Sequence, residues 1–199
     1  MAIGSETKAT GNRSFAGGVK SEANATQSFS FGDTNIIGSG ANQSVAFGQG
    51  NTIAGGGAKY QNVTLGRYNT IDGVVDYAFG TSNTISHTDV SVVTEHGGSL
   101  AVGLSNTINS NNASVALGRG NTIPGTAVRA AAIGESNTAS ARASIALGYN
   151  NTSSGYASTA VGFQNISSSQ ASFAGGYKSD ATSNNSFAYG NDAQASGAN

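Results

Sequence analysis

The chain contains 199 residues and has a formal net charge of −1, with only 10% charged residues, 29 glycines and no cysteine. The lack of cysteine excludes disulfide and thiol chemistry, and the scattered single charges exclude a nucleic-acid surface or a patch that binds anionic membranes. Apolar residues make up 37% of the chain, below the roughly 45–50% of ordinary globular proteins, so a repetitive fold is favoured over a conventional compact core.

A short pattern, Ser-Φ-Ala-Φ-Gly with Φ an apolar residue, recurs along the whole sequence. Most intervals between its final glycines equal the step from Gly4 to Gly18, and the longest runs from Gly80 to Gly103. Repetition at a nearly fixed period of about 14 residues indicates a solenoid, in which each unit buries its face against the next. The glycines that end the pattern are Gly4, Gly18, Gly32, Gly48, Gly66, Gly80, Gly103, Gly118, Gly134, Gly148, Gly162, Gly176 and Gly190.

Each repeat predicts two short strands separated by turns. The Φ-x-Φ alternation before the glycine is typical of a strand with one buried face, and we expect Φ to point inward. The glycine then turns the chain with a positive φ. Three residues later, nine consecutive repeats carry asparagine, which either tolerates left-handed geometry, satisfies turn backbone groups or forms a ladder between coils. Five residues after the glycine lies the inward residue of the second strand, which is isoleucine from Ile37 to Ile123 and alanine or serine elsewhere.

Stacking of these units predicts an all-β fold, a parallel β-roll (β-solenoid) of about thirteen coils that spans residues 1–199 as a single domain. Since one coil of parallel strands advances about 4.8 Å, the roll would extend roughly 60 Å. Helices are disfavoured because glycine, asparagine, serine and threonine dominate and no helical stripe of apolar residues is present.

The length changes all fall at one corner, between the second strand and the next Ser-Φ strand. One insertion covers about 54–61, and a larger one covers about 86–98 and holds both histidines. The alternation in the larger insertion suggests a projecting hairpin, which is either a binding site or a structural decoration. A metal could bind there, but the spacing matches no established motif, so we predict no metal and no cofactor. The candidate binding residues of the two insertions are Lys59, Tyr60, His87, Asp89, Glu95 and His96.

Two further columns predict surface contacts. Alanine lies between the two Φ residues, so we expect it to point outward, where a column of small residues either lies on a cramped exposed strand or packs closely against neighbouring chains around a symmetry axis. This predicts a trimer interface at Ala46, Ala101, Ala116, Ala132, Ala146 and Ala160. The residue after the glycine is aromatic in three successive repeats, at Tyr149, Phe163 and Tyr177. These rings either form a shallow stripe for a protein or glycan or cover the turn beside them.

The repeat resembles the head repeats of YadA-like trimeric autotransporter adhesins, whose units read approximately N-S-V-A-I-G-x-x-A-x-A. The nearest matches are Gln43 to Gly48, Ala113 to Gly118 and Ala143 to Gly148. The resemblance implies a left-handed parallel β-roll in each chain of a homotrimer, at the bacterial outer surface beyond a stalk and a membrane anchor. The Asn-Thr-Ile repeats depart from the family's Ala-x-Ala. No heptads are present, so we expect the chain to be a head fragment of a longer secreted protein.

The sequence therefore predicts a binding module rather than an enzyme. An adhesin head would attach to host matrix, host cells or other bacteria, and related heads imply binding to matrix such as collagen. The alternatives are a structural spacer with no ligand, and ice binding by the aligned threonines, although these form one column rather than a doubled rank. Catalysis lacks support because the histidines share one insertion, the acids are unpaired and no phosphate-binding loop is present.

Overall fold

The computed structural model describes residues 1–56, 59–87, 98–110 and 112–197. Within these ranges all regular elements are β-strands, and they form a parallel β-solenoid of about thirteen coils, which confirms the prediction from the repeat. The chain divides into two compact units, Met1–Ser105 and Asn106–Asn199.

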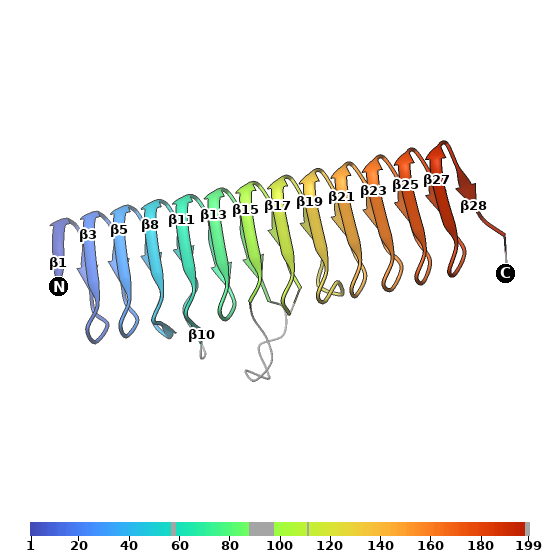
Figure 1. Ribbon diagram of the computed structural model, residues 1–199. Coiled ribbons are helices and arrows are strands. Elements are labelled where there is room, and N and C mark those ends of the chain that lie inside the picture. The colour runs from blue at the N-terminus through green and yellow to red at the C-terminus, as the bar shows by residue number, and fades with distance from the viewer. Residues whose placement is uncertain (57–58, 88–97, 111, 198–199) are drawn as a thin grey trace. The chain divides into compact units, whose positions relative to one another are not determined.

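In the first unit, two parallel sheets stack their strands coil upon coil (Figure 1). The longer strands, which end in the Φ-x-Φ-Gly pattern, are β1 (Ala2–Ser5), β3 (Phe15–Val19), β5 (Phe29–Asp33), β8 (Val45–Gln49), β11 (Val63–Arg67), β13 (Tyr77–Thr81) and β15 (Leu100–Leu104). The shorter strands are β2 (Lys8–Ala9), β4 (Glu22–Ala23), β6 (Ile36–Ile37), β9 (Thr52–Ile53), β12 (Thr70–Asp72) and β14 (Thr84–Ser86). A separate pair, β7 (Ala41–Asn42) and β10 (Lys59–Tyr60), lies at the corner where the insertions occur.

The second unit repeats this arrangement with its own strands. The longer strands are β17 (Val115–Arg119), β19 (Ala131–Glu135), β21 (Ile145–Tyr149), β23 (Thr159–Phe163), β25 (Phe173–Tyr177) and β27 (Phe187–Asn191). The shorter strands are β16 (Thr107–Ile108), β18 (Thr122–Ile123), β20 (Thr138–Ala139), β22 (Thr152–Ser153), β24 (Ile166–Ser167), β26 (Asp180–Ala181) and β28 (Gln194–Ala195). In both units the repeat glycines pair with one another, so equivalent residues of successive coils form straight columns.

The glycine that ends each longer strand has the positive φ that the sequence predicts, for example +124° at Gly66. A Cβ added at this position would collide with the carbonyl oxygen of Gly80 in the next coil, so both the φ angle and the close approach require glycine. The residue two places later also has a positive φ, as at Lys20, Tyr68 and Asn150. The left-handed geometry therefore falls on this residue and not on the asparagine that follows it.

The asparagines instead form a buried ladder in each unit. The Asn51 amide nitrogen donates to the Asn35 side-chain oxygen (2.9 Å) and to the Gly66 carbonyl oxygen (2.9 Å), while the Asn69 backbone N–H donates to the Asn51 side-chain oxygen (3.0 Å). In the second unit Asn121, Asn137, Asn151 and Asn165 continue the same pattern from Asn106. The Asn51 amide also donates to the Phe47 carbonyl oxygen of its own turn at 3.2 Å, so the asparagines both satisfy turn backbone groups and form the ladder.

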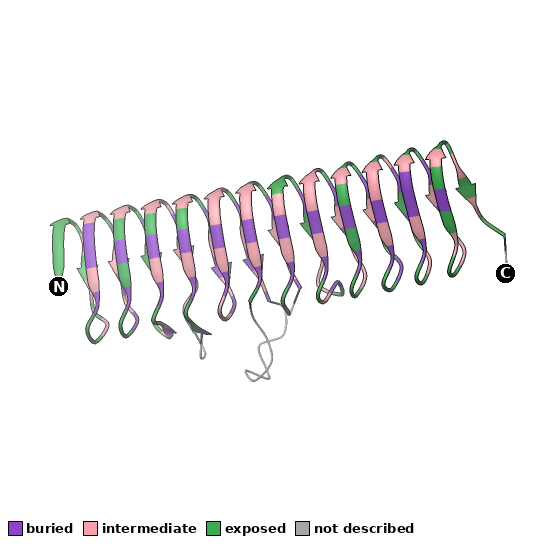
Figure 2. Ribbon diagram, in the orientation of Figure 1, coloured by how far each residue is buried: buried purple, intermediate pink, exposed green. Residues whose placement is uncertain are grey.

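The two side-chain columns of the longer strands face opposite to the predicted directions. The alanines predicted to form a trimer interface, from Ala46 to Ala160, are 0% exposed inside the coil. The Φ residues instead lie outside, and Phe47 and Leu65 are 45% and 49% exposed. Figure 2 shows the resulting alternation of buried and exposed residues along these strands. Because buried methyl groups cannot contact another chain, the interface assigned to the alanine column is wrong.

The narrow interior explains this reversal. Ile37 and Ile53 extend inward from the shorter strands and pack against Ala41 and Ala46. The asparagine ladder fills one corner of the coil, and a column of buried polar residues fills another. Since interiors are packed without voids, only small side chains fit opposite the shorter strands, most of them alanine, and the larger Φ side chains point outward.

Candidate functional site

The corner that precedes most of the longer strands is closed by a buried polar residue. In regular coils this residue is serine, which bonds within its own turn: the Ser144 hydroxyl donates to the Ala141 carbonyl oxygen at 2.7 Å. Two coils of the first unit carry Asn62 and Asp76 at this position instead, and both are 0% exposed. These are the coils next to the two insertions, so the repeat changes its interior where its length changes.

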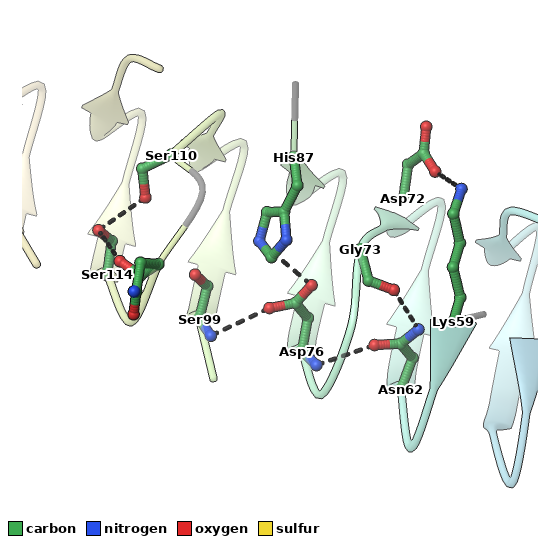
Figure 3. A network of polar contacts seen from close by, with 10 residues as sticks. Lys59, Asn62, Asp72, Gly73, Asp76, His87, Ser99, Ser110 and Ser114 are labelled. Carbon is green, nitrogen blue, oxygen red and sulfur yellow. Dashed lines mark hydrogen bonds and ion pairs between the residues drawn. The ribbon is translucent and has the colours of Figure 1, made fainter. Parts of the chain in front are cut away.

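Asn62 and Asp76 connect neighbouring coils rather than closing one turn (Figure 3). The Asn62 amide nitrogen donates to the Gly73 carbonyl oxygen at 2.8 Å, and the Asp76 backbone N–H donates to the Asn62 side-chain oxygen at 2.8 Å. The Ser99 backbone N–H then donates to Asp76 Oδ1 at 3.0 Å. The result is a second, short polar ladder in the interior of the first unit.

Asp76 is also paired with a histidine inside the coil. The distance from His87 Nε2 to Asp76 Oδ2 is 3.4 Å, and the two side chains are 1% and 0% exposed. Gly73 makes room for the pair, because a Cβ at Gly73 would collide with the Asp76 carboxylate and the His87 ring. Burial raises the pKa of the Asp76 carboxyl from 3.8 to about 7, although hydrogen bonds from the Ser99 and Val74 backbone oppose this shift.

The turn at residues 72–76 contacts the chain on both sides of it. The Lys59 ammonium forms an ion pair with the Asp72 carboxylate, and the Val75 N–H donates to the Tyr60 carbonyl oxygen at 2.8 Å. On the other side, the His87 N–H donates to the Asp72 carbonyl oxygen at 3.1 Å. Val75 itself has a φ of +58°, a strained value for a β-branched residue. This turn therefore holds the ends of both insertions to the roll.

The predicted insertion residues occupy different environments. Lys59 and His87 are buried, whereas Tyr60 is 40% exposed. His87 consequently faces the interior and not a surface site. Asp89, Glu95 and His96, together with the predicted hairpin, lie outside the described residues. Asn62 and Asp76 were not predicted as site residues, although both replace the serine that precedes the Φ-x-Φ strand in most other repeats.

The predicted aromatic column forms a continuous stack on the outer face of the second unit. The Tyr149 and Phe163 ring centroids are 5.0 Å apart, the Phe163 and Tyr177 centroids are 5.2 Å apart, and the planes differ by 13° and 11°. Lys178 Nζ lies 5.1 Å from the Tyr177 centroid. Since neighbouring rings cover each other's faces, the stripe offers ring edges and hydroxyl groups to a ligand, rather than the open faces on which sugars stack.

Beside this stripe, the outer face of the longer strands is apolar in both units. In the first unit Phe31 stacks on Phe47 with centroids 5.5 Å apart. In the second unit Phe173 stacks on Phe187 at 4.8 Å, and Phe187 remains 68% exposed. An extended apolar face of this kind usually marks a contact surface with another molecule.

No group of three or more histidine, cysteine or acidic side chains gathers as a metal site among the described residues. The same residues contain no apolar helix of a length that would cross a membrane.

Comparison with known families identifies the repeat. The model of the YadA head domain repeat matches in two copies, at residues 1–21 and 126–151. These two matches and the β-solenoid fold support a YadA-like head domain. This family indicates an adhesin-type function at the bacterial surface and is typical of proteins that are not enzymes. No curated protein matches the chain in sequence.

Proposed function

We propose that this YadA-like head acts as the exposed part of a trimeric adhesin at the bacterial outer surface, where it attaches to host matrix, host cells or other bacteria. Three left-handed rolls pack together through the outer face of their longer strands. The observation that carries the proposal is the apolar outer face, on which Phe47, Leu65 and Leu147 are 45%, 49% and 39% exposed in the single chain. A thin roll with alanine and serine in its interior gains little hydrophobic stabilisation alone, and association of three copies supplies more.

The outer face of the shorter strands makes a poor competing interface. It presents a threonine column, in which Thr70 pairs in register with Thr52 and Thr84 and Thr122 pairs with Thr107 and Thr138. A hydroxyl group that faces solvent keeps its hydrogen bonds to water, whereas an exposed phenylalanine ring keeps apolar surface in contact with water, which is unfavourable. We therefore assign the threonine face to solvent and the phenylalanine face to the contact between chains.

Solution mass tests the assembly. Light scattering after size exclusion should give three times the 19.7 kDa of one chain. Phe47→Lys should shift the mass to one chain, because the ammonium group would be buried at the interface without a partner. The matched control, Thr70→Lys on the other outer face, should leave the trimer intact. A wild-type monomer with a folded circular dichroism spectrum would reject a self-sufficient trimer.

Attachment needs a second test. The candidate ligand surface is the aromatic stripe at Tyr149, Phe163 and Tyr177, with Tyr60 at the smaller insertion. The wild-type chain should bind an immobilised matrix protein or cultured cells, and replacing all three stripe residues with serine should reduce binding about tenfold or more. Tyr156→Ser is the control, since Tyr156 is an exposed aromatic residue outside the stripe. A stable trimer that binds neither matrix nor cells would favour the spacer function instead.

A further inference from the structure

An exposed column of glutamines lies at the corner of the first unit that precedes the longer strands. Gln27, Gln43 and Gln61 occupy equivalent positions in three successive coils, with φ angles of +56°, +55° and +58°. The backbone holds this column in place, because the Gln43 N–H donates to the Thr26 carbonyl oxygen at 2.9 Å and the Gln61 N–H donates to the Asn42 carbonyl oxygen at 3.0 Å. The glutamine side chains therefore leave a fixed backbone at the spacing of the coils, about 4.8 Å.

The amides of the glutamine column keep hydrogen-bonding capacity for a ligand. The Gln43 amide nitrogen donates to the Gln27 side-chain oxygen at 3.2 Å, which orients these two side chains relative to each other. The Gln61 amide has no hydrogen-bond partner among the residues that the structure describes. Since a primary amide offers two donor hydrogens and an accepting oxygen, the column presents both donors and acceptors to solvent.

Tyr60 adds an aromatic ring to the same corner. It pairs in register with Asn42, and it is 40% exposed, whereas Lys59 beside it is buried. No other ring of the described residues contacts the Tyr60 ring. Asn42 and Val74, the equivalent residues of the coils on either side, have shorter side chains, so the outer part of the ring projects beyond them. Such a ring beside amides suits a sugar, whose C–H groups pack on the ring while its hydroxyl groups bond to the amides.

The charge at this corner favours a neutral ligand. The glutamines carry no charge, and the Lys59 ammonium is already paired with the Asp72 carboxylate (Figure 3). Arg13 holds the equivalent position one coil before Gln27, so the column becomes positive only at its end. An acidic polysaccharide would instead be attracted by positive charge along the whole column.

We propose that Tyr60 and the glutamine column bind a neutral glycan chain that lies along this corner. One sugar packs on the Tyr60 ring, and its neighbours bond to the amides of Gln61, Gln43 and Gln27. The inference rests on the proposed adhesin function and gives one of its ligands a chemical class. Each hydrogen bond contributes little, because the sugar hydroxyl exchanges a bond to water for a bond to an amide. The three columns of a trimer would therefore act together on a surface that carries many glycans.

The second unit provides an internal control for this site. Tyr156, at the equivalent corner, is 52% exposed. The column beside it contains alanines in place of the glutamines, at Ala143, Ala157 and Ala171. Tyr156 thus offers a ring without the adjacent amides, and it should not bind the glycan.

Glycan binding by the intact chain tests the proposal. The probes are immobilised neutral oligosaccharides of hexose and N-acetylhexosamine units, and the same oligosaccharides with a terminal carboxylated sugar. The wild-type chain should bind a neutral probe, and Tyr60→Ala and Gln43→Ala should each weaken that binding about fivefold or more. Tyr156→Ala should leave it unchanged. Lack of binding to every neutral probe, binding that requires the carboxylate, or binding that survives both substitutions would overturn the proposal.

Two conservative variants separate direct contact from a damaged fold. Tyr60→Phe keeps the ring, so it should retain most of the binding that Tyr60→Ala loses. Gln43→Glu keeps the size of the side chain but removes its donors, so it should weaken binding while the circular dichroism spectrum stays that of the wild-type chain. Equal loss in Tyr60→Phe and Tyr60→Ala, or full binding by Gln43→Glu, would contradict the assigned contacts.

Failure of this inference and failure of the proposed adhesin function give different results. A trimer that attaches to a matrix polypeptide but binds no neutral glycan would overturn the glycan site and leave the adhesin function standing. A chain that binds neutral glycans through Tyr60 and Gln43, but neither forms a trimer nor attaches to cells, would support the glycan site and reject the adhesin function.

Discussion

The coils at residues 145–190 and the coils at residues 59–99 share their inward columns but close their corners in different ways. In both regions glycine ends the longer strand, asparagine forms the ladder and alanine lies inside. In the regular coils, Ser158 and Ser172 pair with Ser153 and Ser167 across their own coils at 2.6 and 2.7 Å. In the inserted coils, Asn62 and Asp76 bond to neighbouring coils instead.

This difference separates the parts of the repeat that build the roll from the part that can vary. The glycine column is fixed by backbone contact between coils, and most coils also carry the asparagine of the ladder and the inner alanine. The corner touches the segment of variable length, and there the chain can carry a larger or ionisable residue if its neighbours provide hydrogen bonds. Substitutions in the shared columns should therefore have equal effects in the two regions, and substitutions at the corner should not.

The largest effect should come from the glycine column. Gly66→Ala and Gly148→Ala should each lower the unfolding free energy by about 4 kcal/mol or more, because both residues have a positive φ and each added methyl group would strike a carbonyl oxygen of the next coil. Thermal denaturation followed by circular dichroism measures the loss. Gly120→Asn is the control: its φ is also positive, but the equivalent residues of the next two coils are Ser136 and Asn150, so stability should hardly change. If either alanine variant keeps the stability of the wild-type chain, the glycine column does not constrain the two regions equally.

The asparagine ladder should give the next largest effect. Asn69→Ala and Asn151→Ala should each cost about 2–4 kcal/mol, since each removes the side-chain hydrogen bonds to buried backbone groups of its own coil and of the next coil. Serine at these positions should restore part of the loss, because Ser179 keeps the bond to the Gly190 carbonyl oxygen at 3.1 Å. Chemical denaturation of the four variants makes the measurement. A loss confined to one region would contradict the shared ladder.

At the corner, the effect should depend on pH and on the region. The folded pKa of Asp76 is about 7, above its unfolded value of 3.8, so its contribution to stability is present below pH 3.8 and is lost as pH rises through 7. Asp76→Asn should therefore stabilise the chain by about 1–3 kcal/mol at pH 8 and by little at pH 4. Ser158→Ala, at the regular corner, should change stability equally at both pH values. Denaturation at several pH values distinguishes these outcomes.

The smallest effect should come from the two exceptions in the alanine column. The buried Thr64 hydroxyl has no hydrogen-bond partner in the described part of the chain, whereas the Ser30 hydroxyl donates to the Asn35 carbonyl oxygen at 3.2 Å. Thr64→Ala should therefore stabilise the chain by about 1 kcal/mol, and Ser30→Ala should destabilise it by a similar amount. Opposite signs in paired thermal melts would support this assignment, and equal signs would refute it.

Much of the roll was predictable because its constraints repeat along the sequence. The spacing of glycines such as Gly134 and Gly148 predicted the coil length, and alternation around them predicted the strands. Alternation alone does not say which face is inside, and hydrophobicity pointed to the wrong one. A usable signal was present: the inner position is almost always alanine, while the outer position ranges from Gly17 to Phe31 and Tyr189, as expected where one site is cramped and the other is open.

The candidate site was less predictable. His87 was predicted as a site residue from the sequence, but its partner was not. Asp76 precedes β13 in the sequence and His87 follows β14, and the two side chains contact each other only because the coil closes between them. The departure of Asn62 and Asp76 from the serine of other repeats marked the coil as unusual, without showing that their side chains turn inward.

The sequence by itself determined the period, the strands, the glycine turns and the resemblance to YadA-like head repeats, because each depends on local residue types repeated many times. Only the tertiary structure decided which column fills the interior, that the asparagines join neighbouring coils, and that Asp76 meets His87. These features depend on the distance between two sheets and between successive coils, and that distance is set by packing of residues far apart in the chain.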